Sequence, residues 1–113
     1  TINMDGTAIM QGCATFFLAS LYGIDLGASE IITIVITATI ASIGTAGIPS
    51  AGIIMLTVIF TQIGIPLEGI TLLLGVDRLL DMMRTSVNVS GDLCISCVIA
   101  SSENKINHKV FNS

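Results

Sequence analysis

The sequence has no tryptophan, four phenylalanines and one tyrosine, so no band of interfacial aromatic side chains can be drawn along it. Lysine and arginine together number four and the net charge is −4, which leaves no basic surface to neutralise phosphates and excludes nucleic acid as a partner. Only 11% of the residues are charged, whereas 52% are hydrophobic and the mean hydropathy is +0.92. This composition indicates a membrane protein.

Residues that carry out catalysis or hold metal ions are also scarce. The single histidine, His108, lies in the polar C-terminal segment, so no Ser/His or Cys/His pair is available, and no phosphate-binding loop occurs. Cys94 and Cys97 have C-x-x-C spacing but no second ligand pair, so we interpret them, with Cys13, as small apolar helix residues. The sequence therefore predicts that the protein is not an enzyme.

The chain opens on the mostly polar segment TINMDGT, with no initiator methionine and no signal peptide, so we expect a fragment of a longer protein. Asn3 and Asp5 stand directly ahead of an apolar run over residues 8–22, where either side chain could cap a helix. The alternative is that residues 3–6 form an unwound break within a transmembrane helix. That run alone has about 15 residues and falls short of the roughly 20 that cross a bilayer.

Two further apolar runs, residues 31–43 and 53–63, flank a segment with three glycines and one proline, residues 44–52, which will interrupt any helix. Each arm is roughly 20 Å long as a helix, too short for a hydrocarbon core of about 30 Å. The pattern predicts a re-entrant hairpin over residues 31–63 whose tip lines a cavity. One long helix with a kink is the alternative.

The densest run of polar side chains, residues 77–92, falls inside a predicted helix over residues 69–100. At about 100° per residue, six of them share an arc of about 100°, which is one helix face, and they extend over about 22 Å. This polar stripe consists of Asp77, Asp81, Arg84, Thr85, Asn88 and Asp92. A solvated surface face is the simplest interpretation. Since the preceding segments look lipid-embedded, we favour a substrate or ion path, because ionisable groups are costly in a membrane.

The charges outside the helices predict an orientation. The loops at residues 23–30 and 64–68 contain no lysine or arginine, whereas Lys105 and Lys109 lie in the tail, residues 101–113. A hairpin returns to the side on which it starts, so both loops lie on one face. The positive-inside rule then predicts external loops and a cytoplasmic C-terminus.

Three motifs stand in order along the chain: NMDGT at residues 3–7, SIGTAGIP at 42–49 and DMMRTSVNVSGD at 81–92. Together they resemble the C-terminal third of the dicarboxylate/amino acid:cation symporters, the glutamate/aspartate transporter family, over residues 1–100. The resemblance implies an all-α membrane protein. Its parts would be half of a broken transmembrane helix (1–22), a re-entrant hairpin that acts as a gate (31–63), a last transmembrane helix that carries the polar stripe (69–100), and the tail.

For the substrate, the resemblance implies that Arg84 pairs with the side-chain carboxylate of an acidic amino acid, a bidentate fit for a guanidinium. Asp81 would hold the α-ammonium group, and Asp77 would lie beside Arg84 and orient it. Family members for neutral amino acids lack the arginine, so Arg84 favours an acidic substrate. Further contacts would come from the side chains of Thr7, Thr85 and Asn88 and from the backbone at Gly47 and Ile48.

For cations, the resemblance implies three sodium sites built from oxygen ligands. Asp92 with carbonyls near Asn3 and Asn88 would form one site, and Asp5 with the Asn3 side chain a second. The third would consist of carbonyls of Thr1, Ser42, Ile43 and Thr45, and it would be completed when the gate closes. An ion that binds only the closed gate shifts the population towards closure. Proton coupling is the alternative.

The resemblance thus implies sodium-coupled symport of glutamate, aspartate or a related dicarboxylate by a multi-pass protein of the plasma or inner membrane. A full-length parent is expected to be a homotrimer. A membrane accessory or structural protein, whose stripe faces a partner helix, is the alternative from another class. The combination of stripe, broken helix and Gly/Pro tip favours transport, because a packing face needs only the stripe.

Overall fold

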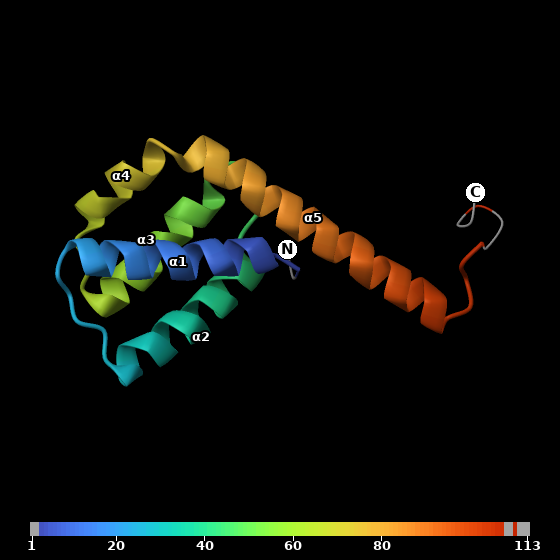
Figure 1. Cartoon of the computed structure of the whole chain (residues 1–113), viewed down its shortest axis with the longest axis horizontal. Coiled ribbons are helices and arrows are strands. Elements are labelled where there is room, and N and C mark those ends of the chain that lie inside the picture. The colour runs from blue at the N-terminus through green and yellow to red at the C-terminus, as the bar shows by residue number, and fades with distance from the viewer. Residues whose placement is uncertain (1–2, 108–109, 111–113) are drawn as a thin grey trace.

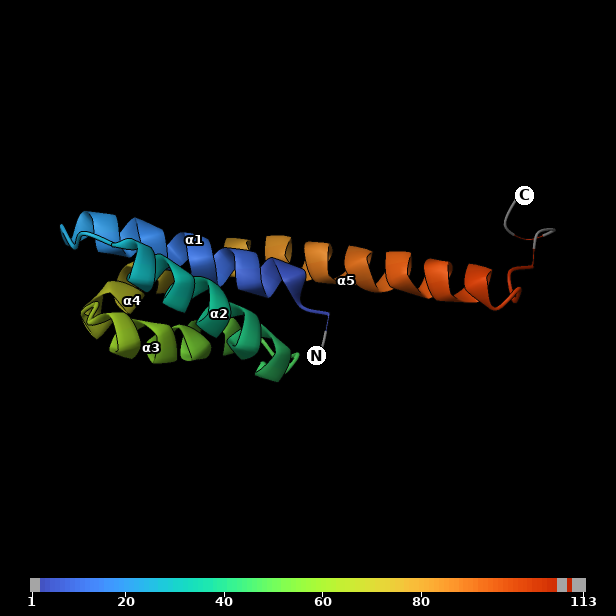
Figure 2. The same cartoon turned by 90° about the horizontal axis from the view of Figure 1, so that it is seen from below.

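The computed structural model describes residues 3–107 and 110, and the regular elements of that part are all helices. They are α1 (Asp5–Leu21), α2 (Ala28–Gly44), α3 (Ala51–Ile63), the short 3-10 helix η1 (Leu67–Gly69), α4 (Ile70–Leu74) and α5 (Asp77–Ser102). Helices α1 to α4 form a bundle at one end, and α5 packs on α1 and then projects beyond it (Figures 1 and 2). The expected all-α class is confirmed. Thr1, His108 and Lys109 lie outside the described residues.

Within the described residues, no helix combines the length with the apolar character required to cross a bilayer.

Helices α2 and α3 run back along one another and are joined by the tip loop, residues 45–50 (Figure 1). Thr37 Oγ1 donates a hydrogen bond to Gln62 Oε1 at 2.7 Å, which joins α2 to α3 away from the tip loop. Ser50 ends the loop with a positive φ of 63°. The alternative of one kinked helix is therefore wrong, because helical geometry stops after Gly44 and resumes only at Ala51.

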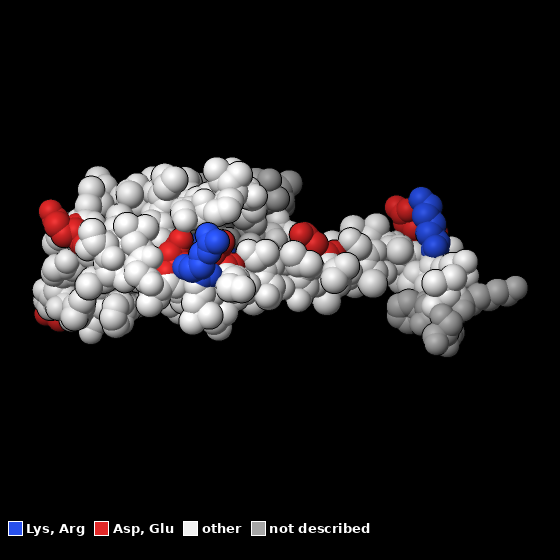
Figure 3. Space-filling model, turned by 90° about the horizontal axis from the view of Figure 1, so that it is seen from above, with Lys and Arg blue, Asp and Glu red and all other residues white. Residues whose placement is uncertain are grey.

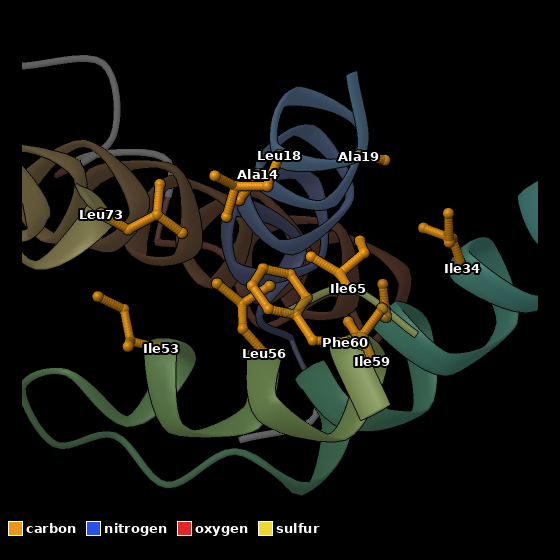
Figure 4. Packing of buried hydrophobic residues seen from close by; sticks show 11 residues of the cluster. Ala14, Leu18, Ala19, Ile34, Ile53, Leu56, Ile59, Phe60, Ile65 and Leu73 are labelled. Atoms are coloured by element: carbon orange, nitrogen blue, oxygen red, sulfur yellow. The ribbon is translucent and has the colours of Figure 1, made fainter. Parts of the chain in front are cut away.

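One face of each helix in the bundle supplies the core. The fully buried side chains include Leu18 of α1, Ile34 of α2, and Leu56 and Phe60 of α3. Figure 4 shows Leu56 and Phe60 pointing from α3 towards α1. Burying each such side chain stabilises the fold by about 1.5–3 kcal/mol. The opposite faces are apolar too, since the exposed large side chains of α2 include Ile32, Val35, Ile36, Ile40 and Ile43.

The segment predicted as one helix over residues 69–100 is divided in the structure. A short α4 ends at Leu74, and α5 starts at Asp77 after Gly75 and Val76. Glycine weakens a helix by about 1 kcal/mol relative to alanine, and Val76, at φ −114° and ψ 0°, departs from the regular angles of an α-helix. The break lets Leu73 join the core through α4 while α5 turns towards α1. The polar stripe therefore lies on α5 alone, beginning at its first residue.

Candidate functional site

Helices α1 and α5 approach each other at Gly6, where there is no side chain to separate them. A Cβ at position 6 would lie 2.6 Å from the carbonyl oxygen of Arg84. The Gly6 amide donates to Asn88 Oδ1 at 2.8 Å, and Asn88 Nδ2 donates to Thr7 Oγ1 at 3.2 Å. This contact joins the NMDGT motif to the polar stripe, which is more than 80 residues away in sequence.

The start of α1 is not capped by a side chain. Met4 occupies the cap position without a side-chain hydrogen bond, so the interpretation of Asn3 or Asp5 as a helix cap is wrong. Asn3 Nδ2 instead donates to Asp92 Oδ1 at 3.0 Å. The side chains of Asn3 and Asp5 approach Gly91 closely, since a Cβ there would lie 2.9 Å from Asn3 Nδ2 and 3.3 Å from Asp5 Oδ2. These polar groups thus face α5 rather than their own helix end.

Arg84 is the buried cation of the polar stripe, with its side chain 5% exposed. Its Nη2 pairs with Asp81 one turn earlier, whereas its Nη1 is buried and has no hydrogen-bond partner within the described residues. Asp77 instead accepts a hydrogen bond from Ser50 Oγ at 2.8 Å, and its Oδ1 is buried without a protein partner. The structure therefore leaves Nη1 of the Arg84 guanidinium without an acceptor among the described residues.

A cavity of about 330 Å³ lies between the start of α1, the tip loop and the polar stripe, and we call it the tip cavity. Its volume is at the lower end of the range of about 300–1,000 Å³ for small-molecule sites, which suits a molecule the size of an amino acid. The predicted site residues that line it are Asn3, Thr7, Thr45, Gly47, Ile48, Asp81, Arg84, Thr85, Asn88 and Asp92. Arg84 and Asp81 thus place opposite charges in one cavity. Figure 3 shows charged side chains in a few separate groups on an otherwise uncharged surface.

Four predicted residues within the described part do not line the tip cavity. Asp77 is turned to Ser50, and Asp5 is exposed beside Gly91. Ser42 is buried, its hydroxyl donates to the Thr39 carbonyl at 2.8 Å, and its carbonyl accepts the Thr45 amide at 3.3 Å. The side chain of Ile43 is exposed. Thr1, the remaining predicted cation ligand, lies outside the described residues.

A cation in this region would depend on carbonyl, amide and single carboxylate oxygens. Within residues 3–107 and 110 there is no group of three or more His, Cys, Asp or Glu side chains that could hold a metal ion. Asn3 Nδ2 donates to the Asp92 carboxylate at the edge of the tip cavity, and Thr45 lines the same cavity. Oxygen donors of this kind suit a hard cation better than a soft transition metal.

Three residues of this region were not predicted as site residues from the sequence. Ser50 and Gly52 fall in the segment over residues 44–52 that was predicted to form a cavity-lining tip, but neither was named as a site residue. Ser50 donates a hydrogen bond to Asp77, and Gly52 lines the tip cavity. Gln11 is fully buried in α1, and its Nε2 donates to the Gly52 carbonyl at 3.4 Å. A glutamine in an apolar helical run was the one available signal, because a buried amide needs a partner.

Replacing Ser50 by alanine is expected to destabilise the protein by about 1–3 kcal/mol, because it leaves the buried Asp77 carboxylate without a donor. Backbone strain stays the same, since both residues have a side chain at a positive φ. Thermal unfolding would measure the change. Ser86→Ala is the matched control, because the Ser86 hydroxyl bonds only to a carbonyl of its own helix. Equal stability of the two variants would contradict the role given to the Ser50–Asp77 bond.

Comparison with known proteins identifies the family of this chain. Residues 1–102 match the model of the "Sodium:dicarboxylate symporter family". The chain belongs to this family. The resemblance inferred from the three ordered motifs is therefore confirmed.

Relatives in this family are similar over most of the chain. Excitatory amino acid transporter 3 of Mus musculus is 52% identical over 92 residues, which are 81% of this chain and 18% of the relative. Excitatory amino acid transporter 2 of Mus musculus is 54% identical over the same share of the chain and 16% of its own length, and transporter 1 of Rattus norvegicus is 51% identical over 17% of its length. The chain thus spans less than a fifth of the length of these relatives. All are named as transporters, which agrees with the expectation that the chain is not an enzyme.

Proposed function

We propose that the chain is the C-terminal part of the transport core of a secondary transporter, which carries an acidic amino acid or dicarboxylate across a membrane together with sodium. Membership of the sodium:dicarboxylate symporter family supports the class of reaction. The names of the relatives, excitatory amino acid transporters, support an amino acid as the substrate. A full-length protein that contains this chain would be a multi-pass homotrimer of the plasma membrane with a cytoplasmic C-terminus.

The observation that carries the proposal is the environment of Arg84. The guanidinium is buried at the wall of the tip cavity, one arm pairs with Asp81 and the other has no partner. A buried donor without an acceptor is costly, and a carboxylate is the acceptor that a guanidinium matches best. A ligand carboxylate at Nη1 would satisfy it, and the α-ammonium group of the same ligand would find Asp81 beside it.

The remaining polar groups of the tip cavity fit the other parts of such a ligand. Thr7 and Asn88 are joined by a hydrogen bond and line the cavity with Thr85. Gly47 and Ile48 of the tip loop lie on the opposite wall. In the proposed mechanism the hairpin of α2 and α3 is the gate, and its tip loop moves over the substrate and withdraws from it. Asp77 is hydrogen-bonded to Ser50 and not to Arg84, so it would affect the position of Arg84 only indirectly, because it holds the start of α5.

Sodium would be carried as a second substrate by the oxygen groups near the tip cavity. Asp92, Asn3 and the Asn88 region would supply one site, Asp5 and Asn3 another, and the carbonyls of Ser42, Ile43 and Thr45 with Thr1 a third. The carbonyls of Ser42, Ile43 and Thr45 stand at the end of α2 next to the tip loop, so their positions depend on the gate. A cation that prefers the closed gate would couple its own gradient to substrate movement.

The test is uptake of radiolabelled aspartate by the full-length protein in liposomes. With an inward sodium gradient and no proton gradient we expect uptake well above that of empty liposomes. With a proton gradient alone we expect none. Uptake driven by protons alone would keep the substrate assignment and replace sodium by protons. No uptake by folded protein under either gradient would overturn the proposal and favour a neutral substrate or an accessory role.

A further inference from the structure

Gly52, in the first turn of α3, faces the guanidinium of Arg84. It is buried and lines the tip cavity together with Arg84. A Cβ at position 52 would collide with Arg84 Nη1, and it would lie 3.0 Å from Arg84 Cζ and 3.1 Å from Met10 Cε. Ordinary Cβ contacts are longer than any of these. The first turn of α3 can therefore lie against the guanidinium only because residue 52 has no side chain.

Hydrogen bonds hold the start of α3 from two sides in this conformation, and they oppose its displacement away from Arg84. Ser50, just ahead of the helix, donates to Asp77 at the start of α5. On the other side the buried Gln11 of α1 donates to the carbonyl of Gly52 itself. Both partners come from neighbouring helices. Added bulk at position 52 would therefore push against whichever neighbour is more easily displaced.

That neighbour is the free end of the Arg84 side chain. The Arg84 backbone is held against α1, because its carbonyl oxygen lies next to Gly6. The guanidinium, in contrast, ends a flexible chain and is held through Nη2 alone, by Asp81. A methyl group at position 52 would shift Nη1 and tilt the plane of the guanidinium while α3 and α5 keep their places.

We propose that Gly52 is a positioning residue for Arg84, which sets where the unpartnered Nη1 donor meets a ligand carboxylate. The inference rests on the proposed function, in which Arg84 binds an acidic substrate. Two parallel hydrogen bonds between a guanidinium and a carboxylate require a fixed plane and a fixed distance. Gly52 therefore affects the affinity for acidic substrates through the position of Arg84, although it has no side chain that could contact the substrate.

The experiment is sodium-driven aspartate uptake by the full-length protein with the substitution Gly52→Ala. We expect its KM for aspartate to rise about tenfold to a hundredfold, as for other misplaced binding groups. The maximal rate should change little, because the loss lies in substrate binding. Gly12→Ala is the matched control, since a Cβ at position 12 of α1 meets nothing within 4 Å, and its KM should stay within about twofold of the unsubstituted protein.

The outcomes separate this inference from the proposed function. No uptake by the unsubstituted protein overturns both. Uptake by the unsubstituted protein, with the KM of Gly52→Ala no different from that of Gly12→Ala, overturns only the role of Gly52. A lower maximal rate of Gly52→Ala with an unchanged KM also overturns it, because that result would place the effect in gate movement.

A second variant decides the matter if Gly52→Ala does not fold. Lysine at position 84 has no planar fork, so the double variant Gly52→Ala/Arg84→Lys removes the collision while it keeps the added methyl group. Recovery of folded protein in the double variant supports a collision with the guanidinium. Failure of the double variant, with Arg84→Lys alone folded, overturns the proposal, because the glycine is then required by the backbone of α3.

Discussion

Arg84→Cys in the full-length protein is expected to reduce the affinity for aspartate by roughly a hundredfold or more, because truncating one partner of a buried charge pair costs about 2–5 kcal/mol or more. The Arg84 side chain is 5% exposed, pairs with Asp81 through Nη2, has no partner at Nη1 and lines the tip cavity. Cysteine removes both the charge and the bulk. The enlarged, less basic cavity is expected to accept a small neutral amino acid such as serine, for which Asp81 remains as the partner of the α-ammonium group.

The measurement is competition of unlabelled aspartate and serine against binding or uptake of the labelled compound. Arg78→Cys is the matched control, because Arg78 is the other arginine of α5, is exposed and does not line the tip cavity. Its affinity for aspartate should stay within about twofold of the unsubstituted protein. An unchanged aspartate affinity in Arg84→Cys would remove Arg84 from the substrate site and with it the main support for an acidic substrate.

Among the glycine-to-alanine substitutions of this chain, Gly6→Ala is expected to cause the largest loss of stability. The added Cβ would lie 2.6 Å from the carbonyl oxygen of Arg84 and 3.0 Å from Val87 Cβ. The first of these is a backbone atom, which cannot rotate away, so α1 and α5 must separate. Overpacking alone typically costs about 1–3 kcal/mol. Separation would also lengthen the hydrogen bonds that Asn88 makes with Gly6 and Thr7, and the total should exceed the overpacking cost.

Thermal unfolding of the purified full-length protein would show this as a midpoint several degrees below that of Gly12→Ala. Both substitutions place alanine in α1, so a difference between them that exceeds the helix propensity gain of about 1 kcal/mol reports the contact with α5. Substrate binding should be lost together with stability in Gly6→Ala, whereas the Gly52→Ala variant should lose affinity at nearly normal stability. Equal midpoints for Gly6→Ala and Gly12→Ala would mean that α5 does not approach α1 at Gly6.

Much of the fold could be predicted from local patterns. The helical class follows from apolar runs with no strand alternation, and the fold-back between α2 and α3 follows from the Gly/Pro segment, which is too rich in helix breakers to continue a helix. The polar stripe also follows from local geometry, since 3.6 residues per turn place Asp81, Arg84 and Asn88 on one face whatever they contact. The family could be recognised because three motifs stand in order in one chain.

The break at Gly75 and Val76 was not predicted, because a single glycine inside an apolar run is compatible with a continuous helix. The break forms because the residues on its two sides pack against different partners. Leu73 packs in the core of the bundle, whereas α5, which begins at Asp77, packs against α1. A local pattern contains no information about such competition between distant neighbours.

The sequence by itself determined the helices, the turn between α2 and α3, the face on which the polar residues of α5 lie, and the family. Only the tertiary structure decided which polar group meets which: Asn3 meets Asp92, Asp77 meets Ser50, and Gly6 and Gly52 each make room for Arg84. The physical reason is that backbone hydrogen bonds within a helix join residues close together in the chain, so a helix appears in the sequence as a periodic pattern of apolar and polar residues. These contacts join residues 27 to 89 positions apart and depend on how closely two backbones can approach.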